Sequence, residues 1–570
     1  MHLPEEDAPM SMRSEYLAAN DGSGLSDQPL IPRERAALLF QAVCVISAFL
    51  IRYFSLPQNG VINGDGVYYA SLGSRLISGN ISDGISAYWS PLYSLLLGVA
   101  YLFTNELEMA GRLVSLVAGS LLIVPAYILL RNFFGKTAAY IGAILVVVHP
   151  LLITSSGWVM TESLYILIFT TTVICGWFAL ENGRRHMFLL TGCLFGAAFL
   201  TKPESIGFVV LFSLLVAVRG LTKPGWEIKR TIAAGLIFLV GFAIFFLPYV
   251  VFIHSKTGRW TVSQKFVNNS TFDEPRQGML KLTKDGSTTM QDRIWWDNYE
   301  AEARVSEERP KLTDPSAPQP RAGFSAVNLA SKIFNNLSKE LREYMRILFP
   351  IPFIFIGAIG FITAPWTRER ATKDIYLLSF VACTFLGYAA TVTEVRYFYV
   401  LIPIFVGWVA LGCVSIGWFV AKHVQKWRNT RWITPVAIQV LLLLLLFASL
   451  VPLFSKEFQR RGIDNVSYEE KAAGLWLRHN SDPHSIVMAA NATVAFYADA
   501  AHIFLPDEDV QTVREYADRK KVDYIVLSER RLKNRQDVYK LSEREIGNVK
   551  LIYEDNAVDG YNVKIYKILE

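Results

Sequence analysis

One aspartate stands where the first long apolar run of this chain gives way to polar residues. Asp65 lies between Gly64 and Gly66 in NGDGVYYASLGSRLISG, residues 63–79. A carboxylate can accept the proton of an attacking hydroxyl group, so Asp65 is a candidate general base. The two glycines would let the backbone turn sharply and present that carboxylate. The alternative is structural, because an aspartate at the start of a helix can simply cap it.

A second carboxylate and a lysine stand beside two other short turns. Glu162, in VMTESLY, begins an apolar run and is a second candidate general base; its alternative role is in an ordinary capping box. Lys202, in FLTKPES, occupies a tight turn between two apolar runs and could face an anionic group. Its alternative is a salt-bridged hairpin tip with Glu204. Each residue alone fits a structural role at least as well as a chemical one.

A fourth turn carries an arginine next to a tyrosine. Arg396, in TVTEVRYFYVLIPIF, could face an anionic group, or could anchor the chain at a membrane interface together with Glu394, Tyr397 and Tyr399. The positions of the apolar runs and of the basic loops put the turns that hold these residues on one face of a membrane. No ionisable residue is expected in the middle of a membrane span. That shared position favours a common site in which a base and cations meet.

Several other kinds of site find little support. No HExxH, CxxC or DxD motif has useful spacing, so we predict no metal site; a divalent metal is compatible with the sequence but not indicated by it. All five cysteines fall inside apolar runs, which leaves no disulfide framework for the outer parts. The net charge is only +6 and the basic residues gather in short loops, so nucleic acid is a poor partner.

The elements that must position these residues are membrane spans. The chain is 52% hydrophobic and 13% aromatic, and its apolar residues come in blocks of roughly 20. The pattern predicts a polytopic α-helical membrane protein with about eleven transmembrane helices. These are expected near residues 36–56, 109–130, 137–153, 163–180, 187–201, 204–219, 231–253, 344–364, 375–393, 397–420 and 432–453.

One further apolar run, PLYSLLLGVAYLFT at residues 91–104, is ambiguous. As a helix it would be only about 21 Å long, against a hydrocarbon core of about 30 Å. Counting it as a crossing would reverse the side of every later loop, whereas leaving it out puts the Lys- and Arg-rich loops inside. We therefore expect 91–104 to lie along the outer leaflet, with Ser90 as N-cap and Pro91 at the first helical position.

This topology divides the chain into three parts. Residues 1–35 form a disorder-prone cytoplasmic tail, and residues 36–453 form a transmembrane domain with outer loops at 57–108 and 254–343. Residues 454–570 form an extracytoplasmic domain in which helix-like and strand-like segments alternate as in an α/β fold, and we expect a hairpin at 551–569. We expect a multi-pass protein of the cell (plasma or inner) membrane.

The polar residues also bear on two competing functions. A transporter usually carries polar or broken-helix sites near the midplane, often in two matching halves, and neither pattern is evident. A non-catalytic membrane protein of cell-envelope polysaccharide assembly would need no shared site of base and cations. Both functions remain as alternatives to an enzyme.

The order of these segments resembles that of a known superfamily. GDGVYYASLGSRLISGN, SPLYSLLLGVAYLF and EMAGRLVSLVAGSLLIVPAYILL are similar to the first outer loop, the surface helix and the next span of the GT-C integral membrane glycosyltransferases. The similarity is to the protein O-mannosyltransferase-like and lipid A aminoarabinose transferase-like branch. It extends over roughly residues 36–420 and implies a GT-C-type helical bundle.

The resemblance also implies a reaction and site residues. It implies a hexosyl- or pentosyltransferase that moves a sugar from a polyprenyl-phosphate donor to an acceptor hydroxyl of a glycan, lipid or protein, with inversion, on the extracytoplasmic side. Asp65 corresponds to the catalytic carboxylate and Glu162 to a second acid, while Lys202, Arg396 and Tyr397 correspond to donor-phosphate ligands. The chain departs from the family in having Gly66 where a second acid often follows Asp65. It also has Trp-Ser-Pro at 89–91 in place of Lys-Pro-Pro, which argues against aminoarabinose as the substrate.

Overall fold

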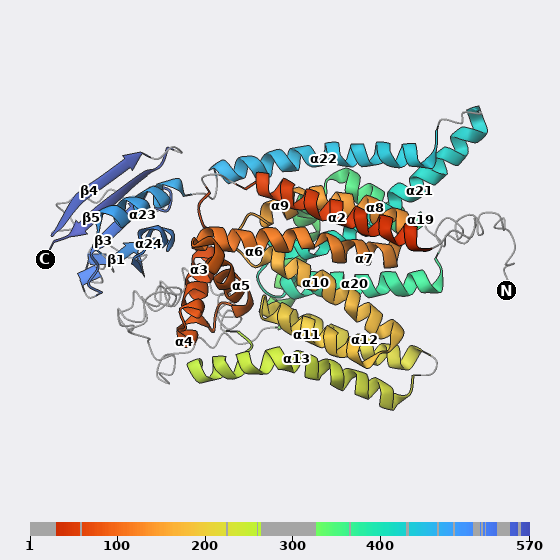
Figure 1. The fold of residues 1–570 in the computed structure, drawn as a ribbon, viewed down its shortest axis with the longest axis horizontal. Coiled ribbons are helices and arrows are strands. Elements are labelled where there is room, and N and C mark those ends of the chain that lie inside the picture. Colours follow the sequence, from red (N-terminus) through yellow and green to blue (C-terminus); the bar gives the residue numbers. More distant parts are fainter. Residues whose placement is uncertain are drawn as a thin grey trace.

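Helices dominate the molecule and form a bundle with a small β-sheet at one end (Figure 1). The computed structural model describes residues 30–56, 60–223, 226–258, 260–263, 326–363, 366–428, 433–463, 467–482, 485–505, 513–514, 517–518, 520–532, 548–556 and 560–569. The predicted disordered tail at 1–35 falls mostly outside these residues, as does most of the predicted loop 254–343.

The bundle consists of helices that lie roughly side by side along the length of the molecule (Figure 1). They are α2 (Leu30–Phe54), α6 (Leu107–Leu121), α7 (Ile123–Phe134), α8 (Lys136–Val148), α10 (Glu162–Asn182), α11 (Arg185–Phe199), α12 (Ile206–Thr222), α13 (Ile228–Thr257), α19 (Ile351–Thr363), α20 (Arg368–Ala389), α21 (Ile402–Arg428) and α22 (Pro435–Ile463). Large apolar side chains such as Leu39 and Val43 on α2 remain exposed on the outside of the bundle. Such a face is typical of a helix that contacts lipid.

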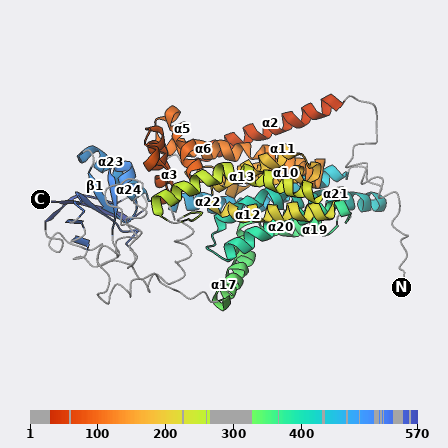
Figure 2. The same ribbon diagram turned by 90° about the horizontal axis from the view of Figure 1, so that it is seen from below.

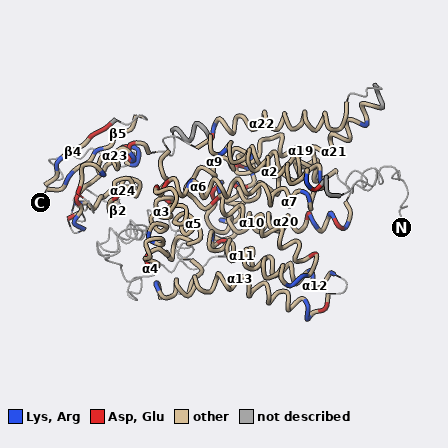
Figure 3. The backbone as a smooth tube through the Cα atoms, viewed as in Figure 1, with Lys and Arg blue, Asp and Glu red and all other residues tan. Residues whose placement is uncertain are grey.

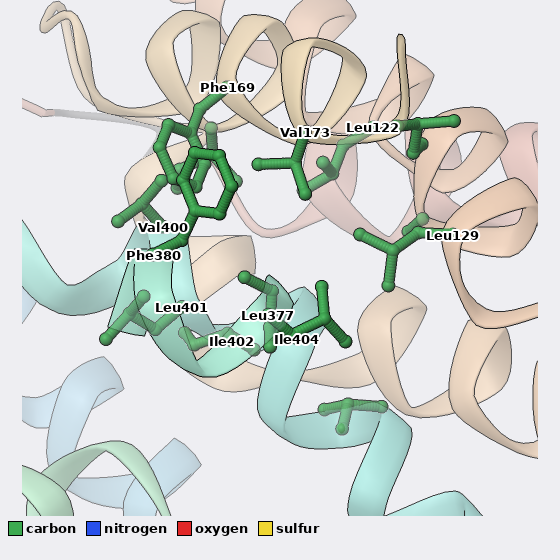
Figure 4. Close-up of a cluster of buried hydrophobic side chains, with 14 of the residues drawn as sticks. Leu122, Leu129, Phe169, Val173, Leu377, Phe380, Val400, Leu401, Ile402 and Ile404 are labelled. Carbon is green, nitrogen blue, oxygen red and sulfur yellow. The ribbon is translucent and has the colours of Figure 1, made fainter. Parts of the chain in front are cut away.

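The centre of the bundle is filled by branched and aromatic side chains. Phe169 and Val173 of α10 lie opposite Leu377 and Phe380 of α20, and side chains from the start of α21 complete the cluster (Figure 4). Elsewhere small residues let helices approach closely. A Cβ added at Gly192 of α11 would lie 2.1 Å from the Phe238 carbonyl oxygen of α13. Such close backbone approach strengthens helix packing in a membrane, where the hydrophobic effect between helices is weak.

The predicted number of spans is not confirmed. Among the described residues, seven helices are long and apolar enough to cross a membrane, or eight if one bent pair counts as a single span. The segments 137–153 and 187–201 form helices α8 and α11 of only 13 and 15 residues. The predicted span 375–393 belongs to α20, which begins in the charged sequence RERATKD at residue 368. These helices still run alongside the longer ones in the bundle (Figure 1).

Two predicted spans are interrupted at prolines. Segment 137–153 breaks at His149, where α8 ends and the short helix α9 (Pro150–Ser155) begins. Segment 344–364 bends by 105° between helices that end at Leu348 and begin at Ile351. A proline disfavours helical backbone in the residue before it, which explains the breaks before Pro150 and Pro350.

Short helices lie across the end of the bundle nearest the sheet. They are α3 (Gly64–Ile77), α4 (Ile81–Gly84) and α5 (Pro91–Thr104) (Figures 1 and 2). The predicted start of α5 is confirmed, with Ser90 as N-cap and Pro91 first, although the Ser90 side chain makes no capping bond. Helices α3 and α5 pack closely, since a Cβ at Gly73 would lie 2.7 Å from the Ser94 carbonyl oxygen.

Basic residues gather at the opposite end of the bundle. Figure 3 shows Lys and Arg near the ends of α12, α20 and α21 that lie farthest from the sheet. The loops predicted to share one side of the membrane therefore share one end of the molecule. Which side of the membrane that end faces stays a prediction from the loop charges.

The C-terminal residues form a mixed sheet with flanking helices. It contains β1 (Ile486–Ala489), β2 (Ala501–Phe504), β3 (Tyr524–Ser528), β4 (Val549–Asn556) and β5 (Asn562–Ile568) in the order β2-β1-β3-β5-β4. Strand β1 is parallel to β2 and β3, whereas β5 is antiparallel to β3 and β4. Helices α23 (Tyr468–Asn480) and α24 (Thr493–Ala498) join it. Helix α22 continues to Ile463, past the domain boundary predicted at residue 454.

Candidate active site

The candidate site begins at the first turn of α3. Asn63 is the N-cap, and its Oδ1 atom accepts a hydrogen bond of 2.7 Å from the Gly66 backbone N–H. Asp65 therefore does not serve as the cap, and its carboxylate is left to make other contacts. Its position in the first turn is electrostatically favourable, because the N-terminal end of a helix carries a partial positive charge.

The glycines beside Asp65 have a different purpose from the one predicted. Neither Gly64 nor Gly66 has a positive φ angle, so neither position needs glycine for a left-handed backbone conformation. Gly66 instead lies against the segment that leads into α10: a Cβ there would stand 2.8 Å from the Val159 carbonyl oxygen and 2.5 Å from Asn63 Oδ1. A hydrogen in place of a side chain thus brings Asp65 close to the start of α10.

Arg396 is the centre of the site. It belongs to the 3-10 helix η4 (Val395–Leu401), which leads into α21. Its Nη1 atom is 3.4 Å from Asp65 Oδ2, and its Nε atom is 2.5 Å from Glu394 Oε2 and 3.9 Å from Glu162 Oε1. One guanidinium group therefore contacts carboxylates from three separate parts of the chain.

A buried ion pair lies behind Arg396. Lys202 Nζ is 3.0 Å from Glu162 Oε1, and only 10% and 3% of the two side chains are exposed. The capping role considered for Glu162 is not observed, because the N-cap residue of α10 is Thr161 and makes no side-chain capping bond. Lys202 donates a hydrogen bond to Glu162 at the start of a neighbouring helix. The alternative of a salt-bridged hairpin tip would have paired Lys202 with Glu204 instead. Breaking such a buried pair on one side leaves an uncompensated charge in a dry environment.

Aromatic rings complete the walls around the two cations. Lys202 Nζ lies 5.1 Å from the centre of the Tyr397 ring and 5.6 Å from that of Tyr165. The Tyr397 ring in turn stacks on Tyr388, with 4.8 Å between their centres. Cations are attracted to aromatic faces at these distances. Tyr397 therefore contacts the lysine as well as neighbouring Arg396, whose guanidinium carbon is 5.6 Å from the same ring.

The structure brings all five predicted residues together at one end of the bundle. Asp65 comes from α3, Glu162 from α10, Lys202 from the residue before η1 (Pro203–Ser205), and Arg396 and Tyr397 from η4. The Asp65 side chain is 36% exposed and that of Arg396 is 23% exposed. An incoming substrate would meet these two before it met the buried Glu162–Lys202 pair.

Neighbouring residues add features that were not predicted as part of the site. Glu394 makes the shortest contact with Arg396, and its extended backbone turns its side chain back to the residue two positions later. Met160 Sδ is 3.4 Å from Arg396 Nη1. Burial and the carboxylates of Asp65 and Glu162 raise the pKa of Tyr69 well above its usual value, so its hydroxyl stays protonated. Only Glu394, two residues before Arg396 in the sequence, could have been chosen beforehand.

The described residues contain no group of three or more His, Cys, Asp or Glu side chains arranged to hold a metal ion. The carboxylates around Arg396 alternate with cations, so most of their negative charge is already compensated within the site. What the arrangement offers is an accessible carboxylate beside an accessible guanidinium. These groups can accept a proton and hold an anionic oxygen within a few ångströms of each other.

Comparison with known proteins identifies the architecture. Residues 90–252 match the family model described as dolichyl-phosphate-mannose-protein mannosyltransferase. The comparison with curated protein sequences found no match. ArnT from Cupriavidus metallidurans in the apo state is 13% identical with a TM-score of 0.55, over 94% of this chain and 98% of that one.

Two further solved structures are similar. The same ArnT bound to undecaprenyl phosphate is 14% identical over 93% of this chain and 97% of that one, with a TM-score of 0.52. The apo Archaeoglobus fulgidus oligosaccharyltransferase is 14% identical over 86% of this chain and 69% of that one, with a TM-score of 0.55. The family model matches part of the helical bundle, and the solved structures share the fold of this chain.

Proposed function

We propose that this protein transfers a sugar from a polyprenyl-phosphate donor to an acceptor hydroxyl group, with inversion at the anomeric carbon. The observation that carries the proposal is the contact between the accessible carboxylate of Asp65 and the accessible guanidinium of Arg396. The match to a mannosyltransferase family model and the undecaprenyl phosphate bound by the similar ArnT structure support a lipid-linked donor. We place the reaction on the extracytoplasmic face of the cell membrane.

The proton of the acceptor determines the role of Asp65. As the acceptor oxygen attacks the anomeric carbon, its O–H bond breaks and the proton passes to the Asp65 carboxylate. The bond between the anomeric carbon and the phosphate oxygen breaks, and its electron pair leaves with the phosphate. A general base at this position typically contributes about 10² to 10⁴ in rate. Attack from the side opposite the leaving phosphate inverts the configuration of that carbon.

The departing phosphate determines the role of Arg396. Negative charge grows on the leaving oxygen, and a guanidinium can hold two phosphate oxygens at once. Arg396 contacts Asp65, Glu162 and Glu394, so donor binding would exchange part of these contacts for phosphate. Tyr397 lies beside Arg396 and restricts where its side chain can move.

Lys202 and Glu162 act together behind Arg396 in this proposal. Lys202 Nζ bonds to Glu162 Oε1, so it would reach the phosphate only by turning from that carboxylate. Glu162 Oε2 has no hydrogen-bond partner among the described residues and is available to orient the acceptor or the Arg396 side chain. We therefore assign proton transfer to Asp65 and assign Glu162 a supporting part in the same centre.

The experiment is donor turnover by the purified protein in lipid nanodiscs. Polyprenyl-phosphate hexoses and pentoses, each labelled in the sugar, are supplied with a mixture of glycan, lipid and peptide acceptors. The proposal predicts that the labelled sugar of at least one donor is transferred to an acceptor or to water, and that polyprenyl phosphate is released. Asp83→Asn on α4 is a matched control, because Asp83 lies in the same loop and its carboxylate accepts a hydrogen bond from Asn80.

The alternatives predict other outcomes for the same preparation. A transporter in proteoliposomes would move a labelled solute across the bilayer without consuming lipid-linked sugar. A non-catalytic assembly protein would neither transfer nor transport. A folded protein that leaves every donor intact would contradict the proposed function.

A further inference from the structure

The C-terminal domain contacts the segment that leads into the active site. Lys471 of α23 donates a hydrogen bond of 2.8 Å from Nζ to the Gly60 carbonyl oxygen. Two residues later, the Ile62 backbone N–H donates to the Tyr497 hydroxyl of α24 at 2.9 Å. The loop is therefore held at two backbone positions by one domain that lies more than four hundred residues away in the sequence.

A third contact continues the same pattern. Asn491, in the turn before α24, lies against Gly64, where an added Cβ would meet Asn491 Oδ1 at 3.2 Å. The C-terminal domain therefore lies against positions 60, 62 and 64 in turn. Asp65 follows immediately after the last of the three. The C-terminal domain thus contacts the chain right up to the candidate base.

The Tyr497 hydroxyl is tied to a buried charged group. It donates a hydrogen bond of 2.7 Å to Glu108 Oε2 while it accepts the one from Ile62. Glu108 also pairs with Arg112 one turn along α6, at 2.5 Å, and with Lys471 at 3.7 Å. Burial and the Glu108 carboxylate raise the pKa of Tyr497, so the hydroxyl remains a donor throughout the physiological range.

Apolar packing surrounds this hydrogen-bonded bridge. Tyr497 and Ala492 belong to the same buried cluster as Ile62, Val67 and Tyr69 of the first outer loop. A contact made through a shared core excludes water, and hydrogen bonds inside it are stronger than at a surface. The domain is therefore joined to the loop as one packed unit.

We propose that the C-terminal domain is a fixed part of the active centre, and that Tyr497 is a positioning residue for Asp65. The inference rests on the proposed function for its catalytic consequence, but the physical clamp stands on the contacts alone. The Tyr497 hydroxyl fixes the backbone three residues before Asp65, and Lys471 and Asn491 hold the positions on either side. The charged group of Glu108 and Arg112 anchors the hydroxyl to α6, which begins at the same end of the bundle.

The test removes the hydroxyl alone. Tyr497→Phe keeps the ring in the apolar cluster but leaves the Ile62 N–H without its acceptor. Hydrogen exchange of peptides covering residues 60–68 should accelerate about tenfold, which corresponds to the net loss of about one hydrogen bond. The kcat of sugar transfer should fall about ten- to a hundredfold, because a small misplacement of a reacting group lowers the rate by about that factor. The KM for the donor should change by less than about twofold, since Arg396 is not altered.

Two further variants separate positioning from general destabilisation. Tyr524→Phe removes a hydroxyl from buried strand β3 of the same domain and should leave both exchange at 60–68 and kcat unchanged. Lys471→Met removes the bond to Gly60 and should act in the same direction as Tyr497→Phe. An equal loss of kcat in Tyr524→Phe and Tyr497→Phe would overturn the positioning role.

The two measurements also distinguish this inference from the proposed function. Unchanged exchange at 60–68 in Tyr497→Phe would overturn the clamp, whatever the activity. Faster exchange with kcat within about twofold of wild type would show that the clamp does not position the base. A wild-type protein that consumes no donor would refute the proposed function instead, and the exchange measurement would still decide whether the clamp exists.

Discussion

Replacing Asp65 with asparagine separates a catalytic role from a structural one. Asparagine keeps the size of the side chain and can still donate and accept hydrogen bonds, but it cannot take a proton at neutral pH. The cap of α3 is provided by Asn63, so Asp65→Asn leaves the capping bond to the Gly66 N–H intact. Within the described part of the chain, Asp65 forms one ion pair, with Arg396 at 3.4 Å.

The structure sets the size of both expected effects. The Asp65–Arg396 pair is partly exposed, and such pairs contribute about 0–1 kcal/mol to stability. Its loss should therefore lower the unfolding midpoint by no more than about 2 °C in a protein of this size. Loss of a general base should lower kcat by about 10² to 10⁴, or about 3 to 5.5 kcal/mol in activation free energy.

The assay measures turnover and thermal unfolding on the same preparation. Wild type, Asp65→Asn and the control Asp83→Asn are compared with a donor that the wild type consumes. We expect a large loss of kcat only in Asp65→Asn, with all three proteins unfolding at nearly the same temperature. Turnover above about a tenth of wild type in Asp65→Asn would lie outside the range for a general base and would refute the assignment.

Three other changes probe the rest of the site. Arg396→Gln should raise the KM for the donor at least about tenfold, because a charge-assisted bond to phosphate is lost; an unchanged KM would place the phosphate elsewhere. Glu162→Gln should destabilise the protein by about 3–5 kcal/mol by leaving Lys202 buried without its partner, and Lys202→Met in the same chain should restore most of that loss, as measured by unfolding temperature. Gly66→Ala should reduce both stability and turnover, since its Cβ would be forced against the Val159 carbonyl oxygen. Wild-type values for both would mean that the backbone around Val159 can shift to accommodate the methyl group.

The positions of the site residues were predictable because of chain topology. Glu162, Lys202 and Arg396 each stand at a turn where an apolar run begins or ends, and loop charge assigned all these turns to one side. Residues at the same end of an antiparallel bundle lie near one another even when they are far apart in sequence. The structure accordingly joins Lys202 to Glu162 and Arg396 to Asp65.

The individual contacts were not predictable in the same way. Sequence proximity suggested Glu204 as the partner of Lys202, but the ion pair forms between neighbouring helix ends. Asp65 and Asn63 were equally eligible as caps, because both residue types favour that position. Asn63 caps α3, and the segment just before it is contacted by the distant C-terminal domain.

Helix lengths were the least predictable part of the fold. Apolar composition marks the start and end of a run but does not reveal a break inside it, and the runs at 137–153 and 344–364 both break before a proline. The contact between Tyr497 and Glu108 joins residues 389 positions apart. No periodicity or motif indicates such a pair, because it depends on the packing of two separately formed units.

The most direct test is a cryo-electron microscopy structure of Asp65→Asn with a polyprenyl-phosphate sugar bound. The substitution should trap the donor by removing the base while leaving Arg396 in place. We predict phosphate oxygens about 3 Å from the Arg396 guanidinium and the anomeric carbon facing the side chain at position 65. A lipid phosphate held instead by the basic loops at the opposite end of the bundle would contradict the proposed site.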